Sequence, residues 1–154
     1  MSIEKEINQS KFRNDWQKAL VNIIYTCNWV MEEQKNHLDR GGLTLQQYNI
    51  LRILKGSGQP ISTLKIRERM LDKMSDTSRI VDRLIAKNLV EKCINQTDKR
   101  LVDVSISQKG IELINWMDNY THEIDDILKN LNEAEVQQLN ELLDKVRVKE
   151  VNKE

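Results

Sequence analysis

Apolar residues recur every three or four positions between residues 11 and 39, which is the spacing of one face of an α-helix. The residues on this face are Trp16, Leu20, Ile23, Cys27 and Val30. A second apolar stripe lies near the end of the chain and consists of Val136, Leu139, Leu142, Leu143 and Val146. The pattern therefore predicts long helices with an apolar face at both ends of the chain, over residues 11–39 and within residues 107–150.

Between these ends, helix caps mark shorter helices. Thr44 and Gln47 have the spacing of a capping box, Ser62 can cap a helix that runs to about residue 71, and Ser75 can cap the helix after it. Asn88 tolerates the left-handed conformation in which helices often end. The residues that these helices are expected to bury include Leu64, Ile66, Met70, Ile80, Leu84 and Ile85.

Two strand-like segments follow, over residues 89–95 and 101–106, and a short extended segment at 59–61 is a candidate minor strand. Apolar residues at 102, 104 and 106 alternate with polar ones at 103 and 105, which predicts one buried and one wet face. Ser107 is expected to cap a fifth helix reaching about residue 128, and Asn132 with Glu135 to cap a last one. The predicted fold is mainly α with a small β wing: a winged helix-turn-helix over residues 43–106, flanked by terminal helices within a single domain.

The formal net charge is zero, but the charges are unevenly distributed. Residues 61–100 carry ten basic and six acidic side chains, whereas residues 101–154 carry six basic and twelve acidic ones. The basic stretch coincides with the helix after Ser75 and with the hairpin. Because phosphates respond to a local basic face rather than to the overall charge, this region is the candidate nucleic-acid surface.

Two short helices joined by a tight turn form a helix-turn-helix, whose second helix enters the major groove N-terminus first. Residues 75–79 would then lie nearest the bases, where hydroxyls bind base edges and arginines reach guanine or phosphate. Asp76 has two candidate roles, as a local helix cap or as an acceptor from cytosine. The candidate contacts to bases and phosphates are Ser62, Thr63, Lys65, Lys73, Ser75, Asp76, Thr77, Ser78, Arg79 and Arg83.

The tip of the hairpin carries Asp98, Lys99 and Arg100. A narrow minor groove has a strong negative potential that attracts an inserted arginine. Asp98 can hold the guanidinium of Arg100 in place through a charge-assisted hydrogen bond. Each of these elements alone is common on protein surfaces, but the order of helix, turn, basic helix and cationic hairpin is uncommon and favours binding to double-stranded DNA.

These segments resemble the DNA-binding domain of the MarR family of bacterial transcription regulators. The matching motifs lie at residues 43–51, 74–84, 87–91, 98–100 and 104–110. The chain departs from the family at Asn88, where glycine is usual, and at Cys93, next to a position that is often basic. The resemblance covers nearly the whole chain. It implies a homodimer acting as a repressor on an inverted-repeat operator, with the helices of residues 11–39 and 107–150 at the dimer interface.

Regulators of this family often respond to small phenolic or lipophilic molecules, or to oxidation of a cysteine. By this resemblance, an effector would lie between the dimerisation helices and the winged region. The candidate pocket residues are Trp16, Tyr25, Trp29, Tyr48 and Trp116, and the alternative is that these aromatics belong to the core or the dimer interface. Cys27 is the candidate redox sensor, although its place on the apolar seam favours a buried, inert thiol.

Other functions find little support in the sequence. His37, with Glu33 one turn before it, and His122 are the only histidines, and solvated histidines rather than a metal site are expected. No motif of a phosphate-binding loop, a zinc protease or a nucleophile elbow occurs, so neither an enzyme nor a cofactor is expected. The absence of a long apolar run and of a signal peptide, with two cysteines far apart, predicts a cytoplasmic protein without a membrane span.

Two alternatives stay open at this point. One is a winged-helix module that binds other proteins and no DNA, because a fold does not determine a function. The other is a metal- or redox-responsive sensor in which DNA binding is secondary to the chemistry of Cys27.

Overall fold

Helix α2 (Asp15–Arg40) is the longest element of the computed structural model, which describes residues 2–95, 98 and 102–148. Asn14 caps it by accepting a hydrogen bond from the amide of Gln17 at 2.9 Å, so the helix begins four residues later than predicted. A short helix that the sequence did not predict, α1 (Ile3–Glu6), precedes it. The hydroxyl of Tyr25 donates to Glu6 at 3.0 Å and ties this segment to α2.

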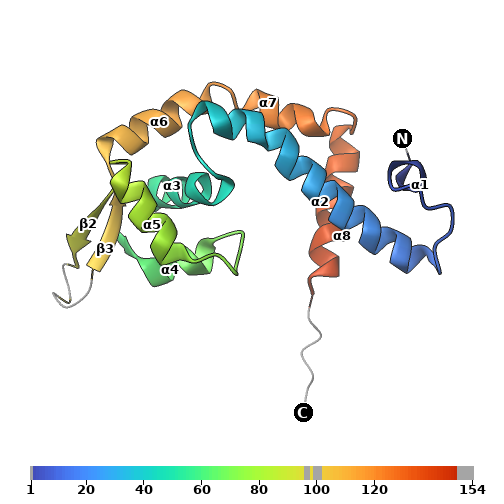
Figure 1. The fold of residues 1–154 in the computed structure, drawn as a ribbon, viewed down its shortest axis with the longest axis horizontal. Coiled ribbons are helices and arrows are strands. Elements are labelled where there is room, and N and C mark those ends of the chain that lie inside the picture. Colours follow the sequence, from blue (N-terminus) through green and yellow to red (C-terminus); the bar gives the residue numbers. More distant parts are fainter. Residues whose placement is uncertain (1, 96–97, 99–101, 149–154) are drawn as a thin grey trace, which may run out of the picture.

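A lobe of three helices and a small sheet lies at the C-terminal end of α2 (Figure 1). Its elements are α3 (Leu45–Ser57), β1 (Ile61–Ser62), α4 (Thr63–Arg69), α5 (Thr77–Ala86), β2 (Val90–Ile94) and β3 (Val102–Ile106). The strands are antiparallel in the order β1-β3-β2, with Ile61 opposite Val104 and Val90 opposite Ile106. The predicted winged helix-turn-helix and its minor first strand are both confirmed.

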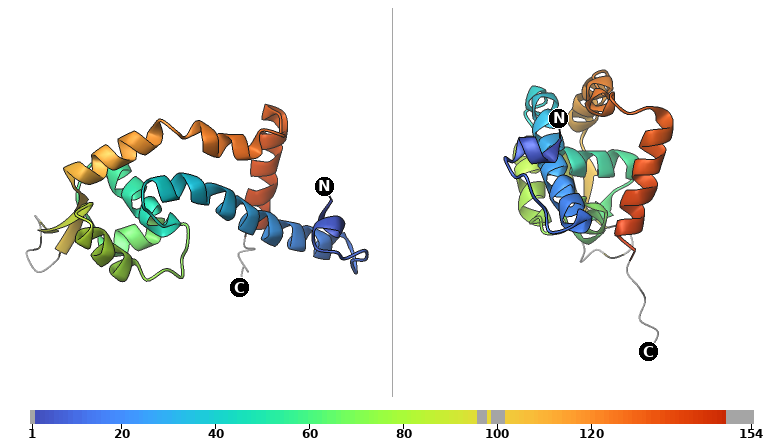
Figure 2. Two further views of the ribbon diagram at one scale, coloured as in Figure 1. Left: turned by 45° about the horizontal axis from the view of Figure 1, so that its top comes forward. Right: turned by 90° about the vertical axis from the view of Figure 1, so that its right-hand side faces the viewer.

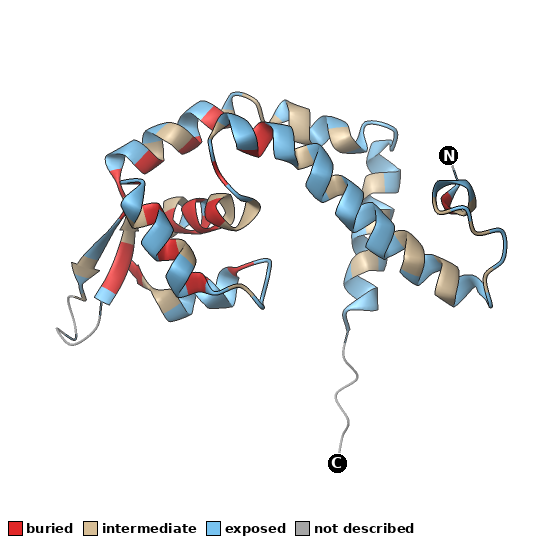
Figure 3. Cartoon of the chain, in the orientation of Figure 1, coloured by how far each residue is buried: buried red, intermediate tan, exposed pale blue. Residues whose placement is uncertain are grey.

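Most buried residues gather in this lobe and in the helix that follows the sheet (Figure 3). The largest of them are Ile50, Leu51, Ile66, Met70, Leu84, Ile114 and Met117. They come from α3, α4, α5 and the first helix after the sheet, so one core holds the recognition region together. The arm that leaves the lobe is mostly exposed or half-buried by comparison.

The arm is built from α2 and from the helices that follow the sheet. These are α6 (Gln108–Asp118), α7 (His122–Asp125), the short 3₁₀ helix η1 (Asp126–Leu128) and α8 (Glu133–Val146). Helices α6 and α7 run back from the lobe, and α7 packs against α2 (Figure 1). In the end-on view of Figure 2, α8 stands apart from α2, and none of its residues is buried.

The prediction of one continuous helix from residue 107 to about 128 is wrong, because the helix breaks after Asp118. The amide of Tyr120 bonds to the carbonyl three residues back, at 3.0 Å, which tightens the chain out of the α-helix. Asp118 itself is held from α3 by Lys55, at 2.6 Å, and by Arg52. The pattern of apolar positions could not predict these ion pairs, because they join residues that are far apart in the sequence.

Most helix caps are confirmed. Capping boxes occur at Thr44 with Gln47 and at Asn132 with Glu135, and Ser62 and Ser107 cap α4 and α6. Asn88 adopts the expected left-handed conformation, with φ 59°.

The cap of α5 was predicted wrongly, because Asp76 rather than Ser75 caps that helix. The hydroxyl of Ser75 is already committed to the carbonyl of Asp72, at 2.9 Å. Helix α4 also ends earlier than predicted, since the amide of Leu71 bonds to the side chain of Asn49 at 2.9 Å instead of continuing the helix.

Two predictions of burial are also wrong. Leu64 was expected in the core but is 65% exposed, because its position on α4 faces outward. In β3, Val102 is exposed and Asp103 is buried. The Asp103 carboxylate accepts a hydrogen bond from Asn95 at 2.7 Å, which satisfies the buried charge, while Val102 lies at the outer end of the strand.

The apolar stripes of the arm are largely uncovered in the single chain. Trp16 is 84% exposed, and Leu20, Ile23 and Leu142 are exposed as well. No helix within the described ranges has both the length and the apolar character that a bilayer crossing needs.

Candidate DNA-binding surface

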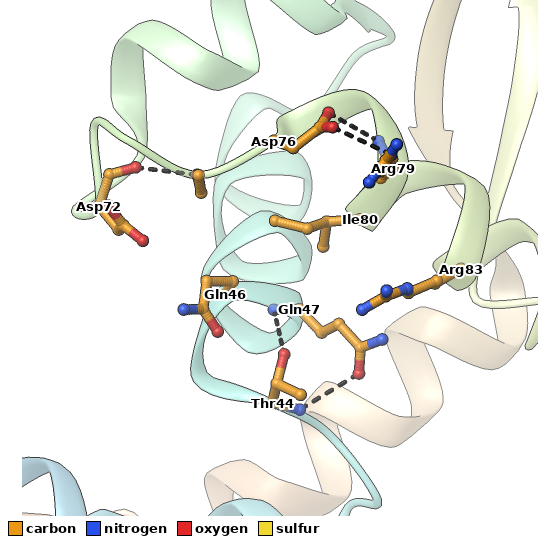
Figure 4. A pocket seen from close by; sticks show the side chains of 9 residues that line it. Thr44, Gln46, Gln47, Asp72, Asp76, Arg79, Ile80 and Arg83 are labelled. Carbon is orange, nitrogen blue, oxygen red and sulfur yellow. Dashed lines mark hydrogen bonds and ion pairs between the residues drawn. The ribbon is translucent and has the colours of Figure 1, made fainter.

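The first turn of α5 forms a ridge between two open hollows. The α3-side hollow, drawn in Figure 4, is lined by Thr44, Gln46, Gln47, Asp72, Ser75, Asp76, Arg79, Ile80 and Arg83. The α4-side hollow is lined by Thr63, Leu64, Arg67, Met74, Ser75, Asp76, Thr77 and Ser78. Ser75 and Asp76 border both hollows, so the start of α5 has open space on two sides.

Asp76 positions Arg79 at this ridge (Figure 4). One carboxylate oxygen of Asp76 accepts the backbone amide of Arg79 at 3.2 Å, and the other pairs with its Nε at 3.3 Å. The local-cap role considered for Asp76 is therefore the one observed. The Arg79 side chain remains 80% exposed, so its guanidinium is oriented without being covered.

Arg83 lies one turn after Arg79, on the same face of α5, and is also exposed. Both arginines line the α3-side hollow, where Figure 4 shows Arg83 extending toward the start of α3. In the described part of the chain Arg83 has no ion-pair partner. The two guanidinium groups thus form a cationic edge beside the ridge.

The hydroxyl residues predicted for the bases do not all face outward. Ser78 is exposed and Ser75 is half-buried, but Thr77 is only 3% exposed. Thr77 shares a helix face with Val81 and Leu84, both buried, and its hydroxyl has no hydrogen-bond partner among the described residues. The expectation that Thr77 faces outward toward the bases is therefore wrong, and its burial gives no support to the predicted base contact.

The rear of α5 is fixed by lysines that the sequence pattern did not single out. Lys87 donates to the carbonyl of Gly42 at 2.6 Å and to the side chain of Gln47 at 3.2 Å. Gln47 is buried and also closes the capping box of α3. Lys109 donates to the carbonyl of Lys87 at 3.1 Å. These bonds tie the C-terminal end of α5 to the start of α3 and to the start of α6.

The remaining predicted contacts are spread around the ridge. Lys65 and Lys73 are exposed, and the ammonium of Lys73 donates to the carbonyl of Glu68 at 2.5 Å. Ser62 and Thr63 are half-buried at the start of α4. Asp98 is exposed, with its amide bonded to Asn95 at 2.8 Å, whereas Lys99 and Arg100 lie outside the described residues.

Some residues at the two hollows were not predicted from the sequence, namely Gln46, Arg67 and Met74. The signal for Gln46 was its place in the first turn of a capped helix. Met74 had no such signal, because an apolar residue next to a turn is usually a core residue.

The five aromatics proposed for an effector pocket do not meet in one chain. Tyr48 packs edge-on against His37, at 6.1 Å between ring centroids, while Trp16 lies 21 residues earlier on the same helix as His37. At the helical rise this separation is about 30 Å, too far for one small pocket. Tyr25 and Trp29 lie exposed along α2 between them, and Trp116 pairs with Tyr120 at 5.2 Å.

Cys27 and His37 are both placed differently from the expectation. Cys27 is exposed rather than buried, since nothing in the described chain covers that side of α2. His37 is buried, with 4% exposure, and neither ring nitrogen has a hydrogen-bond partner among the described residues. No group of three or more potential metal ligands occurs among those residues.

His37 lies where the arm joins the lobe. Burial lowers its pKa, and Arg40 adds to this, while the carboxylates of Glu123 and Asp118 act in the opposite direction. Arg40 pairs with Glu123 across the joint at 2.7 Å. The joint therefore contains an ion network around a histidine that is neutral when buried.

Replacing His37 by phenylalanine should reduce the sensitivity of the fold to mild acid. Because the pKa of His37 is lowered in the folded chain, the unfolded chain binds more protons below about pH 6.5, and stability falls as the pH drops through that value. The wild type should lose up to about 1.4 kcal/mol per pH unit there from this residue. Denaturant unfolding at pH 7.5 and 5.5, at equal protein concentration, measures the difference.

The matched control is His122→Gln, because His122 is exposed and its removal should leave the acid sensitivity in place. If His37→Phe and the wild type lost the same unfolding free energy between pH 7.5 and 5.5, the acid sensitivity would not come from His37.

Comparison with known proteins agrees with this geometry. Residues 41–101, which span the lobe from the end of α2 to the wing, match the model of the MarR family. The HTH-type transcriptional regulator MhqR of Bacillus subtilis is 29% identical over 119 residues, 76% of this chain and 81% of MhqR. The HTH-type transcriptional repressor IacR of Pseudomonas putida is 32% identical over 129 residues, 83% of this chain and 74% of IacR.

The fold is also that of a solved regulator. A mutant MarR of E. coli in complex with operator DNA superposes with a TM-score of 0.74, covering 96% of this chain and 100% of MarR at 23% identity. The family model matches the winged region, and the similarities to IacR and to the MarR structure extend over most of the chain, so the chain belongs to the MarR family of transcription regulators.

Proposed function

We propose that this regulator is a repressor that binds an inverted-repeat operator as a homodimer, with α5 of each copy in the major groove. The observation that carries the proposal is the ridge formed by the start of α5. It combines exposed Ser78, Arg79 and Arg83 with open space on both sides, as insertion into a groove requires. The operator DNA in the MarR complex is in keeping with this role of the lobe.

The uncovered apolar face of the arm supports the homodimer. Trp16, Leu20 and Ile23 on α2 and Leu142 and Val146 on α8 are exposed in the single chain. Several large apolar side chains exposed along one helix normally mark an interaction site. A two-fold dimer through the arm would place two copies of α5 about one DNA turn, roughly 34 Å, apart and would require an operator with matching symmetry.

Separate roles follow for the surface residues. Ser78, Arg79 and Arg83 are assigned to the major groove, and Lys65 and Lys73 to phosphates. Asp76 orients Arg79 and does not contact DNA. For Lys99 and Arg100 the minor-groove role rests on the sequence alone. A protein acting on chromosomal operators is expected to work in the cytoplasm.

The rival hypotheses have less support. A protein-binding module without DNA is disfavoured by the relatives, which are named transcriptional regulators and repressors. The sensor based on Cys27 stays a prediction, with the exposure of the thiol in its favour. A small phenolic or lipophilic effector also stays a prediction, without a pocket shared by the five aromatics.

Selection of duplexes from a random pool by the full chain tests the proposal. The expected product is an inverted repeat whose half-site centres lie about one helical turn apart, bound by two chains as judged by sedimentation of the complex. Recovery of no enriched sequence would contradict DNA recognition. Enrichment of an asymmetric site bound by one chain would contradict the dimer.

A further inference from the structure

Two large apolar side chains stand exposed beside the recognition helix. Met74 is 93% exposed and Leu64 is 65% exposed, and both line the α4-side hollow next to the first turn of α5. They come from different segments, the linker before α5 and the first turn of α4. Exposed apolar side chains grouped next to a polar ridge mark a contact surface rather than a core.

The backbone holds Met74 in this position. Its amide donates to the carboxylate of Asp72 at 3.0 Å, and the hydroxyl of Ser75 donates to the carbonyl of Asp72 at 2.9 Å. Leu64 follows the cap of α4, where Ser62 accepts from the amide of Lys65 at 3.3 Å. The apolar wall of the hollow is therefore built on fixed backbone.

The chemistry of the hollow matches one base. Its rim carries the exposed hydroxyl of Ser78, and its wall carries the two apolar side chains. In the major groove, thymine presents a hydrogen-bond acceptor, O4, beside its 5-methyl group. A serine hydroxyl next to an apolar wall complements that pair, whereas cytosine and guanine offer no methyl.

We propose that Met74 and Leu64 receive the 5-methyl group of a thymine in each operator half-site and so contribute to sequence selection. The proposal rests on the proposed function, since it requires α5 in the major groove. It adds a source of specificity that is independent of charge, because an apolar contact releases no counterions.

The test replaces thymines of the selected operator by uracil, one symmetric pair of positions at a time, which removes only the methyl groups. At one symmetric pair of positions, affinity of the wild type should fall about fifteenfold, or about fourfold per half-site, from the burial of one methyl. Met74→Ala and Leu64→Ala should bind the thymine duplex more weakly than the wild type does. Replacing thymine by uracil should then lower the affinity of these variants only slightly further. The slope of affinity against salt should not change in either variant.

The control is Leu71→Ala, another exposed apolar residue of the same linker that does not line the hollow. It should bind thymine and uracil duplexes like the wild type. Tight operator binding that no uracil affects, or an equal loss by Met74→Ala on both duplexes, would overturn methyl recognition while leaving the proposed function standing. If the wild type enriched no duplex from the random pool, both the proposed function and methyl recognition would be overturned.

Discussion

Replacing Arg79 and Arg83 together by alanine is expected to weaken operator binding about a thousandfold or more, because two arginine contacts are lost in each of the two half-sites and each contact contributes about 1–3 kcal/mol. Both side chains are exposed on the same face of α5, so the fold should be unaffected. Fluorescence anisotropy with the selected duplex measures the affinity at several salt concentrations.

The single variants separate base recognition from phosphate binding. Removing a side chain that neutralises a phosphate should lower the salt slope by about one per phosphate, whereas removing one that binds guanine should relax the sequence preference at one position. Arg147→Ala is the matched control, since it removes the same charge from the end of α8, far from the lobe along the chain. If the double variant bound the operator as tightly as the wild type, the assignment of α5 to the DNA interface would be wrong.

Replacing Gly110 by alanine is expected to destabilise the lobe by about 1–3 kcal/mol or more. A Cβ at this position would lie 2.3 Å from the carbonyl oxygen of Leu89 and 2.8 Å from a side-chain carbon of Ile106. That carbonyl accepts a hydrogen bond from the amide of Ser107 at 3.0 Å, so it cannot move without releasing the start of α6. Thermal unfolding should show a midpoint lowered by several degrees.

Gly56→Ala is the matched control for this change. Gly56 lies inside α3, and the nearest atom to its new Cβ is the end of the Arg69 side chain at 4.0 Å. Alanine there should stabilise the helix by up to about 1 kcal/mol. If Gly110→Ala unfolded at the wild-type midpoint, the close approach of α6 to the backbone of Leu89 would not constrain the fold.

Local chemistry made much of the fold predictable. A capping box needs only two side chains three residues apart, so Thr44 with Gln47 and Asn132 with Glu135 were recognisable without knowledge of the rest of the chain. The choice between Ser75 and Asp76 as the cap of α5 was not, because Asp72 decides it by binding Ser75.

Burial was less predictable, since it depends on what the tertiary structure covers. His37 is buried by the joint between arm and lobe, whereas Cys27 is exposed because no described residue covers that side of α2. For the candidate site, Arg79 and Arg83 of α5 are exposed, as a contact with DNA requires, and the contact itself stays a prediction. The burial of Thr77 was available in its spacing to Val81 and Leu84, four and seven residues on, which places all three on one helix face.

The insertion of α5 into the major groove is tested most directly by methylation interference on the selected operator. Methylation of guanine N7 lies in the major groove and that of adenine N3 in the minor groove. The expected result is two clusters of guanines, about ten base pairs apart, whose N7 methylation blocks binding. Binding that tolerates N7 methylation throughout the operator would contradict the account.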